Sequence, residues 1–193
     1  MSNRIAILAA FGALALLSGC AGVNLVEAGK PTDLGDGVSV VPPVAWAKVA
    51  TIGAPPFLTI DGIGLGELHY YTGIAPGNPI FTVPGVSKAE ASTYNANMLP
   101  NDVMDLLAAT LQKAGNEAVK TSDLAPAKFG SANGFKFHLS YVAKSGLEMK
   151  GEALIAQRGG KLDVLLFVAP TEYYYDHRLP DAEQLFGAVQ VMG

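Results

Sequence analysis

The segment from residue 134 to residue 170 constrains the fold of this chain more than any other part of the sequence. It contains three runs of β-type residues, separated by Ser145-Gly146 and Gly159-Gly160 pairs that are typical of tight turns. In the first run, alternation places Phe135, Phe137, Leu139 and Tyr141 on one face and Lys136, His138 and Ser140 on the other. The third run, 162–169, is almost entirely apolar, as in a central strand covered on both faces. We therefore expect an antiparallel three-stranded meander with other elements packed on both sides of its third strand.

Helices are predicted before and after this meander. Residues 100–114 begin with Pro100 and two aspartates and end with Lys113, which is followed by Gly115, and their apolar residues form one stripe. A second helix is expected at about residues 181–189. Residues 38–81 have the pattern of short strands broken by prolines, with an irregular segment at 75–96. The predicted fold class is α+β, a mostly antiparallel sheet with flanking helices in an α/β sandwich.

The run from about residue 100 to residue 189 resembles the PsbP-like superfamily. Four features carry the resemblance: the helix at 100–114, the Gly134-Phe135-Lys136-Phe137 strand start, the Gly160-Lys161 turn into LDVLLFVAP, and Leu185-Phe186 in the closing helix. The resemblance implies the same sandwich. It also implies an accessory or binding role, because that superfamily contains such proteins more often than enzymes.

The first 20 residues have the pattern of a bacterial secretion signal. Arg4 is followed by thirteen apolar residues, 5–17. As a helix these would rise about 20 Å, which is less than the roughly 30 Å of a bilayer core. The signal ends in Leu17-Ser18-Gly19-Cys20, which resembles the lipobox of bacterial lipoproteins. The resemblance implies cleavage between Gly19 and Cys20 and lipidation of the Cys20 thiol.

This resemblance predicts where the protein resides. Lipid chains on Cys20 would anchor it stably to a membrane, and Ala21 after the cysteine favours the periplasmic face of the outer membrane in the bacterial cell envelope. The alternative is an ordinary secretory signal in which Cys20 is incidental. The expected organisation is a signal peptide at 1–19, the lipidated cysteine and a flexible tether at 20–37, and one globular domain at 38–193.

Composition and motifs exclude several classes of function. With 13 basic and 17 acidic residues, the chain has no basic excess for nucleic acid, and a single Cys cannot form an internal disulfide. His69, His138 and His177, with Glu67, are the candidate metal ligands, and the alternative is three unrelated histidines. No HExxH motif supports a metal site, so no metal or cofactor is predicted. The Gly62–Gly66 series precedes a strand and is interpreted as a strand entrance or bulge. No GxSxG motif is present.

The run from residue 172 to residue 178, EYYYDHR, is the most unusual local composition in the chain. Three adjacent tyrosine rings cannot all face one core, so at least one is expected at the surface. One hypothesis is a partner-binding surface made of Tyr173, Tyr174, Tyr175, His177 and Arg178. The alternative is a loop that holds the last helix on the sheet.

Three functions remain open on the sequence alone. The first is a membrane-anchored envelope lipoprotein that acts as a binding or accessory protein, not an enzyme, with an envelope protein as its partner. The second is a small-molecule or lipid carrier, which would need an apolar pocket lined by the sheet face that carries Phe135 and Phe137. The third is a hydrolase whose catalytic residues come together only in the fold.

Overall fold

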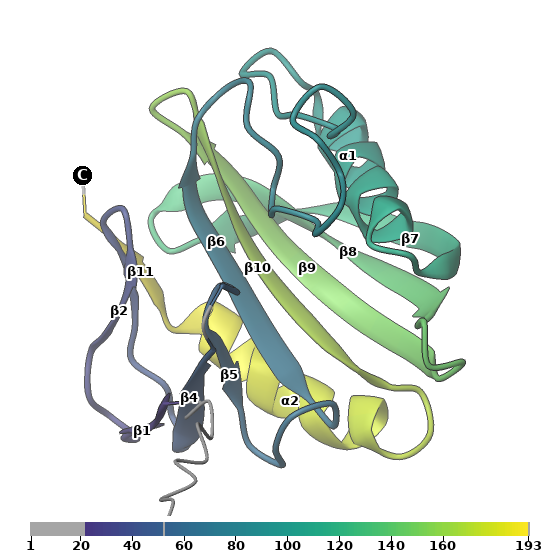
Figure 1. Cartoon of the computed structure of the whole chain (residues 1–193). Helices are drawn as coiled ribbons and strands as arrows, with labels where there is room; N and C mark the ends of the chain where they lie inside the picture. The colour runs from purple at the N-terminus through teal and green to yellow at the C-terminus, as the bar shows by residue number, and fades with distance from the viewer. Residues whose placement is uncertain (1–21, 52, 193) are drawn as a thin grey trace, which may run out of the picture.

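The computed structural model describes residues 22–51 and 53–192, so the predicted signal peptide and Cys20 lie outside the described residues. Its main feature is an eight-stranded antiparallel sheet (Figure 1). In spatial order its strands are β1 (Gly22–Val26), β4 (Trp46–Ala50), β5 (Phe57–Thr59), β6 (Glu67–Ile74), β10 (Lys161–Pro170), β9 (Glu148–Arg158), β8 (Ala132–Val142) and β7 (Glu117–Phe129). A smaller sheet has the order β11 (Val189–Val191), β3 (Val38–Val40) and β2 (Thr32–Gly35). The helices are α1 (Pro100–Lys113) and α2 (Tyr174–Gly187).

The helices cover opposite faces of the large sheet. Helix α1 packs on one face, in a core that includes Phe137 and Leu166. Helix α2 and the small sheet pack on the other face, in a core that includes Leu165 and Phe167. Strand β10 supplies alternate residues to both cores, and all of its residues after Lys161 are buried. These layers confirm the predicted α+β class and a third meander strand covered on both faces.

The meander and α1 follow the sequence prediction closely. Strands β8, β9 and β10 pair in register through the two predicted turns. At the start of α1, the backbone N–H of Leu99 donates to the Asp102 carboxylate at 2.8 Å, which satisfies a donor near the helix N-terminus. The apolar stripe of α1, with Val103 and Leu107 fully buried, packs on the sheet as expected.

The range expected to be a tether, 20–37, contains two strands. Strand β1 pairs with β4 at the edge of the large sheet, and β2 pairs with β3 in the small sheet. In β1 only Val26 is buried. Because an edge strand can join a sheet through its backbone alone, β1 does not need the alternation of apolar residues by which a strand is recognised in a sequence.

Strand β7, at the other edge, is absent from the sequence prediction for the same reason. Most of its thirteen residues are exposed or half-buried. Its pairing with β8 shifts at two places, between Glu117 and Lys120 and between Ser122 and Ala125. These irregularities and Pro126 suit an edge strand, since they discourage further strands from pairing there.

Helix α2 begins at Tyr174, earlier than the expected start at about Asp181. Pro180 lies inside the helix and lacks the N–H that would bond to the Asp176 carbonyl. Asp176 and Pro180 are both exposed, so water can donate a hydrogen bond to this carbonyl. Burial of Tyr175 and Ala182 on the sheet holds the helix through the proline. The tyrosine run therefore belongs largely to a helix.

The remaining connections agree with the sequence prediction. Residues 75–96 form turns and bends without helix or strand. The Gly62–Gly66 series forms turns that lead into β6, where the backbone N–H of Gly64 donates to the Glu67 carboxylate at 2.7 Å. Neither described helix combines the length and the apolar character that a membrane span needs.

Candidate functional site

The turn that leads into α2 contains a strained backbone. Tyr173 has φ 68° and ψ −58°, and the N–H of Tyr174 donates to the carbonyl of Glu172 at 2.8 Å. This is a γ-turn with a left-handed central residue, which is costly for a side chain as large as tyrosine. Such strain persists only where the surrounding structure enforces it, and it is concentrated at functional positions.

The Tyr173 ring is displayed at the surface and held in place by its neighbours. It is 67% exposed. It stacks on the His177 ring, with centroids 5.0 Å apart and planes at 20°, and it meets the Tyr174 ring edge-on at 5.2 Å and 88°. We call Tyr173, Tyr174 and His177 the aromatic surface. It belongs to the start of α2, which lies at the bottom of Figure 1, whereas α1 lies at the top.

Two members of the predicted partner surface, Tyr175 and Arg178, contact other parts of the protein instead of belonging to the aromatic surface. The Tyr175 ring is buried and stacks on Phe167 at 6.1 Å, and burial raises the pKa of its hydroxyl to about 12. The Arg178 guanidinium forms two bonds of 2.6 Å to the Asp61 carboxylate and one of 3.1 Å to Asp181. These residues fasten α2 to the sheet and to the β5–β6 loop, as in the alternative interpretation of the run.

The Asp61–Arg178 pair predicts a dependence of stability on pH. Hydrogen bonds from Arg178 lower the pKa of Asp61 from its usual 3.8. A carboxyl whose pKa is lower in the folded chain contributes stability above its unfolded pKa, and this contribution is lost as pH falls through the folded pKa. Both side chains are partly exposed, at 24% and 19%, so we expect a loss of about 1 kcal/mol below pH ~4.

Urea unfolding of the wild type and Asp61→Asn at pH 7, 4 and 3 tests this prediction. The variant should be less stable at pH 7 and should lose less stability on acidification. Asp105→Asn, an exposed carboxylate on α1, serves as the control and should keep the wild-type pH dependence. Equal acid losses in Asp61→Asn and the wild type would contradict the prediction.

The three histidines lie in separate places. His69 contacts the Glu67 carboxylate at 2.9 Å on β6, His138 lies on β8, and His177 belongs to the aromatic surface. Within residues 22–51 and 53–192, no group of three His, Cys, Asp or Glu side chains could hold a metal ion. Each of the three histidines thus has its own set of neighbours in the fold.

A charged cluster around Glu152 was not predicted. Glu152 is almost fully buried on the sheet face below α2, where its carboxylate meets His138 Nε2 at 2.8 Å and Lys136 Nζ at 3.3 Å. His138 Nδ1 faces the Asp123 carboxylate at 3.3 Å, and Lys136 also reaches Glu183 on α2 at 3.3 Å. Both ring nitrogens of His138 thus contact carboxylates. The cluster pairs the buried Glu152 carboxylate with Lys136 and His138, and it leaves no ring nitrogen of His138 to act as a base for a nucleophile. A lone glutamate within the apolar GEALIA segment was the signal in the sequence.

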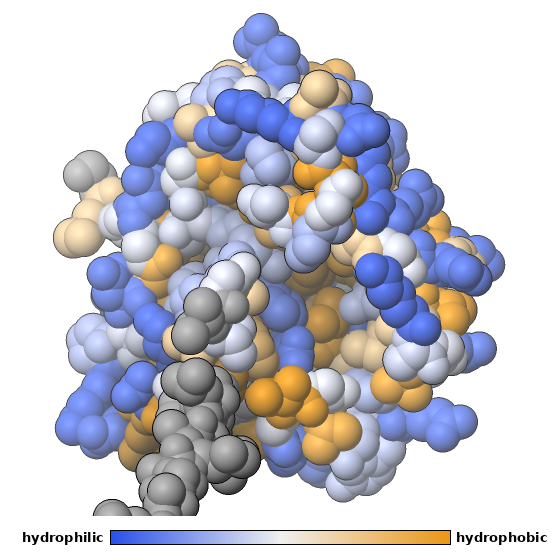
Figure 2. All heavy atoms as spheres, in the orientation of Figure 1, coloured by the Kyte–Doolittle hydropathy of each residue, from blue (hydrophilic) through white to orange (hydrophobic). Residues whose placement is uncertain are grey.

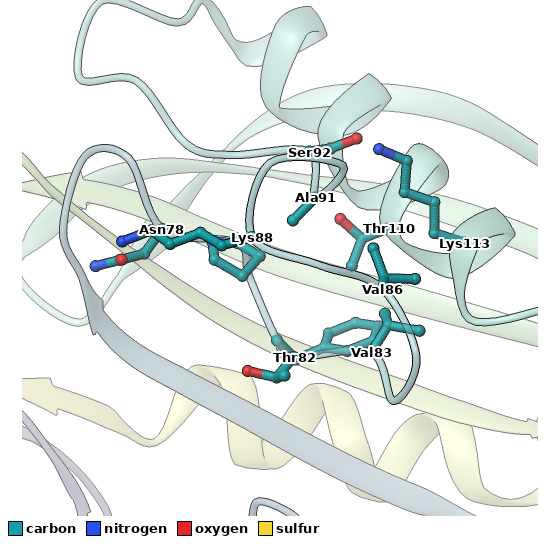
Figure 3. A pocket seen from close by; sticks show the side chains of 11 residues that line it. Asn78, Thr82, Val83, Val86, Lys88, Ala91, Ser92, Thr110 and Lys113 are labelled. Carbon is teal, nitrogen blue, oxygen red and sulfur yellow. The ribbon is translucent and has the colours of Figure 1, made fainter.

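The sheet face that a carrier would use is filled by protein. Phe135 and Phe137 are buried in one core with Val103 and Leu107 of α1. A cavity of about 240 Å³ lies instead outside this core, between the 75–96 loop and α1 (Figure 3). Its lining residues carry no motif that the sequence could reveal, because they come from an irregular loop and a helix.

Comparisons with known proteins identify the fold. No family model and no curated protein matches the sequence. The solution structure of cyanobacterial PsbP (CyanoP) from Synechocystis sp. PCC 6803 matches with a TM-score of 0.54 at 15% identity, over 96% of this chain and 99% of that chain. The crystal structure of LpqN, involved in cell envelope biogenesis of Mycobacterium tuberculosis, matches with a TM-score of 0.38 at 12% identity, over 89% and 92%. The chain therefore has a PsbP-like α/β fold, as the resemblance implied.

Proposed function

We propose that this chain is a lipid-anchored binding protein of the bacterial cell envelope, an accessory protein without a catalytic step that contacts an envelope protein through the aromatic surface. The observation that carries the proposal is the strained and exposed Tyr173, clamped between His177 and Tyr174. Its support from the sequence is the lipobox that ends at Cys20.

The aromatic surface has the properties of a binding contact. Tyrosine offers a large amphipathic area with few rotatable bonds, so its immobilisation in a complex costs little entropy. The stacked His177 and the edge-on Tyr174 hold the Tyr173 ring in the free protein, which lowers that cost further. The buried side of the same turn is fixed by Tyr175 and Arg178, so the surface is preorganised on a rigid base.

The proposed anchor would bring the domain close to the membrane. Strand β1 begins at Gly22, only two residues after Cys20 in the sequence. An acylated Cys20 would therefore hold an edge of the large sheet near the lipid surface, without a long tether. We place the protein on the periplasmic face of the outer membrane, since Ala21 follows the cysteine.

Photo-crosslinking in living bacteria tests the binding role. We would replace Tyr173 by p-benzoylphenylalanine in the full chain, and Leu99, which is equally exposed at 67% but lies next to α1, in the matched control. The proposal expects one reproducible protein adduct from position 173 and none from position 99. Adducts to lipid alone would show that the aromatic surface contacts the membrane instead, and identical adducts from both positions would overturn its assignment.

Two substitutions at Tyr173 separate strain from binding. Tyr173→Gly and Tyr173→Ala both remove the ring, but only glycine adopts the left-handed backbone freely. The glycine variant should therefore be more stable than the alanine variant by about 1 kcal/mol in urea unfolding. Both should lose the partner when crosslinking is repeated from a benzophenone at His177. Equal stability would contradict the strain, and retained crosslinking would contradict the binding role.

A substitution at Cys20 tests the anchor independently. Cys20→Ala removes the thiol that the lipobox presents, so the variant should not be labelled by a radioactive fatty acid and should leave the outer-membrane fraction. Ser18→Ala keeps a small residue before the cysteine and should behave like the wild type. Lipid labelling of Cys20→Ala at the wild-type level would show that the lipobox interpretation is wrong.

A further inference from the structure

The cavity beside α1 is a second candidate site, remote from the aromatic surface. It has a volume of about 240 Å³ and lies between the 75–96 loop and α1 (Figure 3). Figure 2 shows apolar residues emerging among hydrophilic ones in the upper part of the molecule, where Figure 1 places this loop and helix. The lining residues that matter here are Phe81, Val83, Val86 and Lys88 of the loop and Thr110 and Lys113 of α1.

The loop that forms the cavity is held in place before any ligand arrives. At its base, Gly77 N–H donates to the Tyr94 carbonyl and Tyr94 N–H donates to the Asn78 carbonyl, both at 2.8 Å. The Tyr94 ring is buried, and the Gln157 amide donates to its hydroxyl at 3.3 Å. Lys113 Nζ of α1 donates to the Glu90 carbonyl of the loop. A preformed cavity of this kind binds without the entropic cost of ordering a loop.

The lining combines an apolar interior with a cationic rim. Val83 and Val86 of the loop face Thr110 of α1 in Figure 3. Lys88 lies on one side of the cavity, and Lys113 lies on another side beside Ser92 (Figure 3). The buried Thr110 hydroxyl donates to the Leu106 carbonyl at 2.7 Å, so it cannot also donate a hydrogen bond to a ligand.

The charges at the rim are uncompensated within the lining. None of the residues that line the cavity is acidic. The nearby Glu90 carboxylate lies outside the lining, and its pKa is lowered by bonds from the Ser87 hydroxyl at 2.6 Å and the Ser87 N–H at 3.2 Å and, to a smaller extent, by the charge of Lys113. Two ammonium groups around an apolar interior favour a ligand with an anionic head and an apolar body.

We infer that this cavity binds a small aliphatic carboxylate, with the hydrocarbon among Phe81, Val83 and Val86 and the carboxylate at Lys88 or Lys113. The volume is below the 300–1,000 Å³ of pockets that enclose drug-sized ligands, so the ligand is a short chain rather than a whole lipid. This role goes beyond the proposed protein contact, because it uses the 75–96 loop and α1 instead of the aromatic surface.

Equilibrium dialysis with radiolabelled hexanoate tests the inference on the full chain in lipid nanodiscs. Empty nanodiscs give the background, and unlabelled hexanoate, hexanol and hexylammonium serve as competitors. We expect one saturable site, with hexanol and hexylammonium competing at least ~10-fold more weakly than hexanoate. Absence of saturable binding up to about 10 mM, or equal competition by hexylammonium, would overturn the proposal.

Two variants locate the site within the cavity. Ala91→Leu fills the cavity and should weaken hexanoate binding at least ~10-fold, while the double variant Lys88→Gln/Lys113→Gln should weaken hexanoate more than hexanol. Lys120→Gln, an exposed lysine on β7, is the matched control and should bind as the wild type does. Thermal unfolding by circular dichroism shows which variants remain folded. Unchanged binding in a folded Ala91→Leu, or in the folded lysine double variant, would place hexanoate elsewhere and overturn the assignment.

Discussion

Phe167→Ala is expected to lower the free energy of unfolding by about 3–5 kcal/mol, which is a large part of the stability of a domain of this size. The Phe167 ring is completely buried on β10, between α2 and the large sheet, where it stacks on Tyr175 at 6.1 Å. Alanine removes this apolar area from the core and leaves a cavity. The flanking strands cannot close it, because they are held by pairing on both sides of β10.

Urea unfolding followed by circular dichroism measures this effect. Phe167→Leu keeps most of the volume, so its loss should stay below about 1.5 kcal/mol. Leu147→Ala, at the exposed turn before β9, is a further control and should change stability by less than about 0.5 kcal/mol. A loss below about 1 kcal/mol for Phe167→Ala would show that this core is not packed as described.

Asp163→Ala is expected to cost a similar 3–5 kcal/mol, for an electrostatic reason. The Asp163 side chain is buried where the pairing of β10 with β6 shifts register. It accepts a bond from Arg158 Nε at 2.7 Å and one from the Gly73 N–H at 2.8 Å. Its removal leaves a half-buried guanidinium and a backbone donor without their acceptor.

Two comparisons isolate the charge at this position. Asp163→Asn keeps an acceptor for Gly73 but loses the charge, so its loss of stability should lie between those of the wild type and Asp163→Ala. Lys161→Ala breaks the nearby exposed pair with Asp36, whose Nζ–Oδ1 distance is 2.8 Å, and should cost at most about 1 kcal/mol. If Asp163→Ala costs no more than Lys161→Ala, the buried pair does not stabilise the register shift.

Both positions lie on β10, the strand that links the layers. Phe167 supports Tyr175, which in turn fixes the first turn of α2 below the aromatic surface. Asp163 acts near the other end of the same strand, where Arg158 also donates to the Asp36 carbonyl of the β2–β3 turn at 3.2 Å. If Phe167 supports the aromatic surface in this way, a folded Phe167→Leu variant should lose the crosslink that forms from p-benzoylphenylalanine at position 173.

The strong periodic segments were predictable because their burial is regular. Strand β8 and helix α1 each present apolar residues at the spacing of their own secondary structure and pack against a core along that face. Strand β10 is apolar almost throughout and is buried on both faces. The α+β class follows from these segments and from the helices around them. Edge strands β1 and β7 were not predictable, since they join the sheet through backbone hydrogen bonds that any side-chain pattern permits.

The candidate sites were also predictable only where a local sequence pattern marks them. The tyrosine run could be recognised by its composition, but its separation into exposed Tyr173 and buried Tyr175 depends on where α2 starts. The sequence signals only the lone Glu152 of the charged cluster, because its partners come from other strands and from α2. The cavity beside α1 forms where an irregular loop packs on a helix, so no local pattern reveals it.

The sequence by itself determined the central meander, helix α1 and the α+β class, because each depends on neighbouring residues or on a fixed local spacing. Only the tertiary structure decided the edges of the sheet, the start of α2 and the grouping of the site residues. Those features depend on which distant surfaces pack together, and packing can override local signals such as the helix-breaking tendency of Pro180.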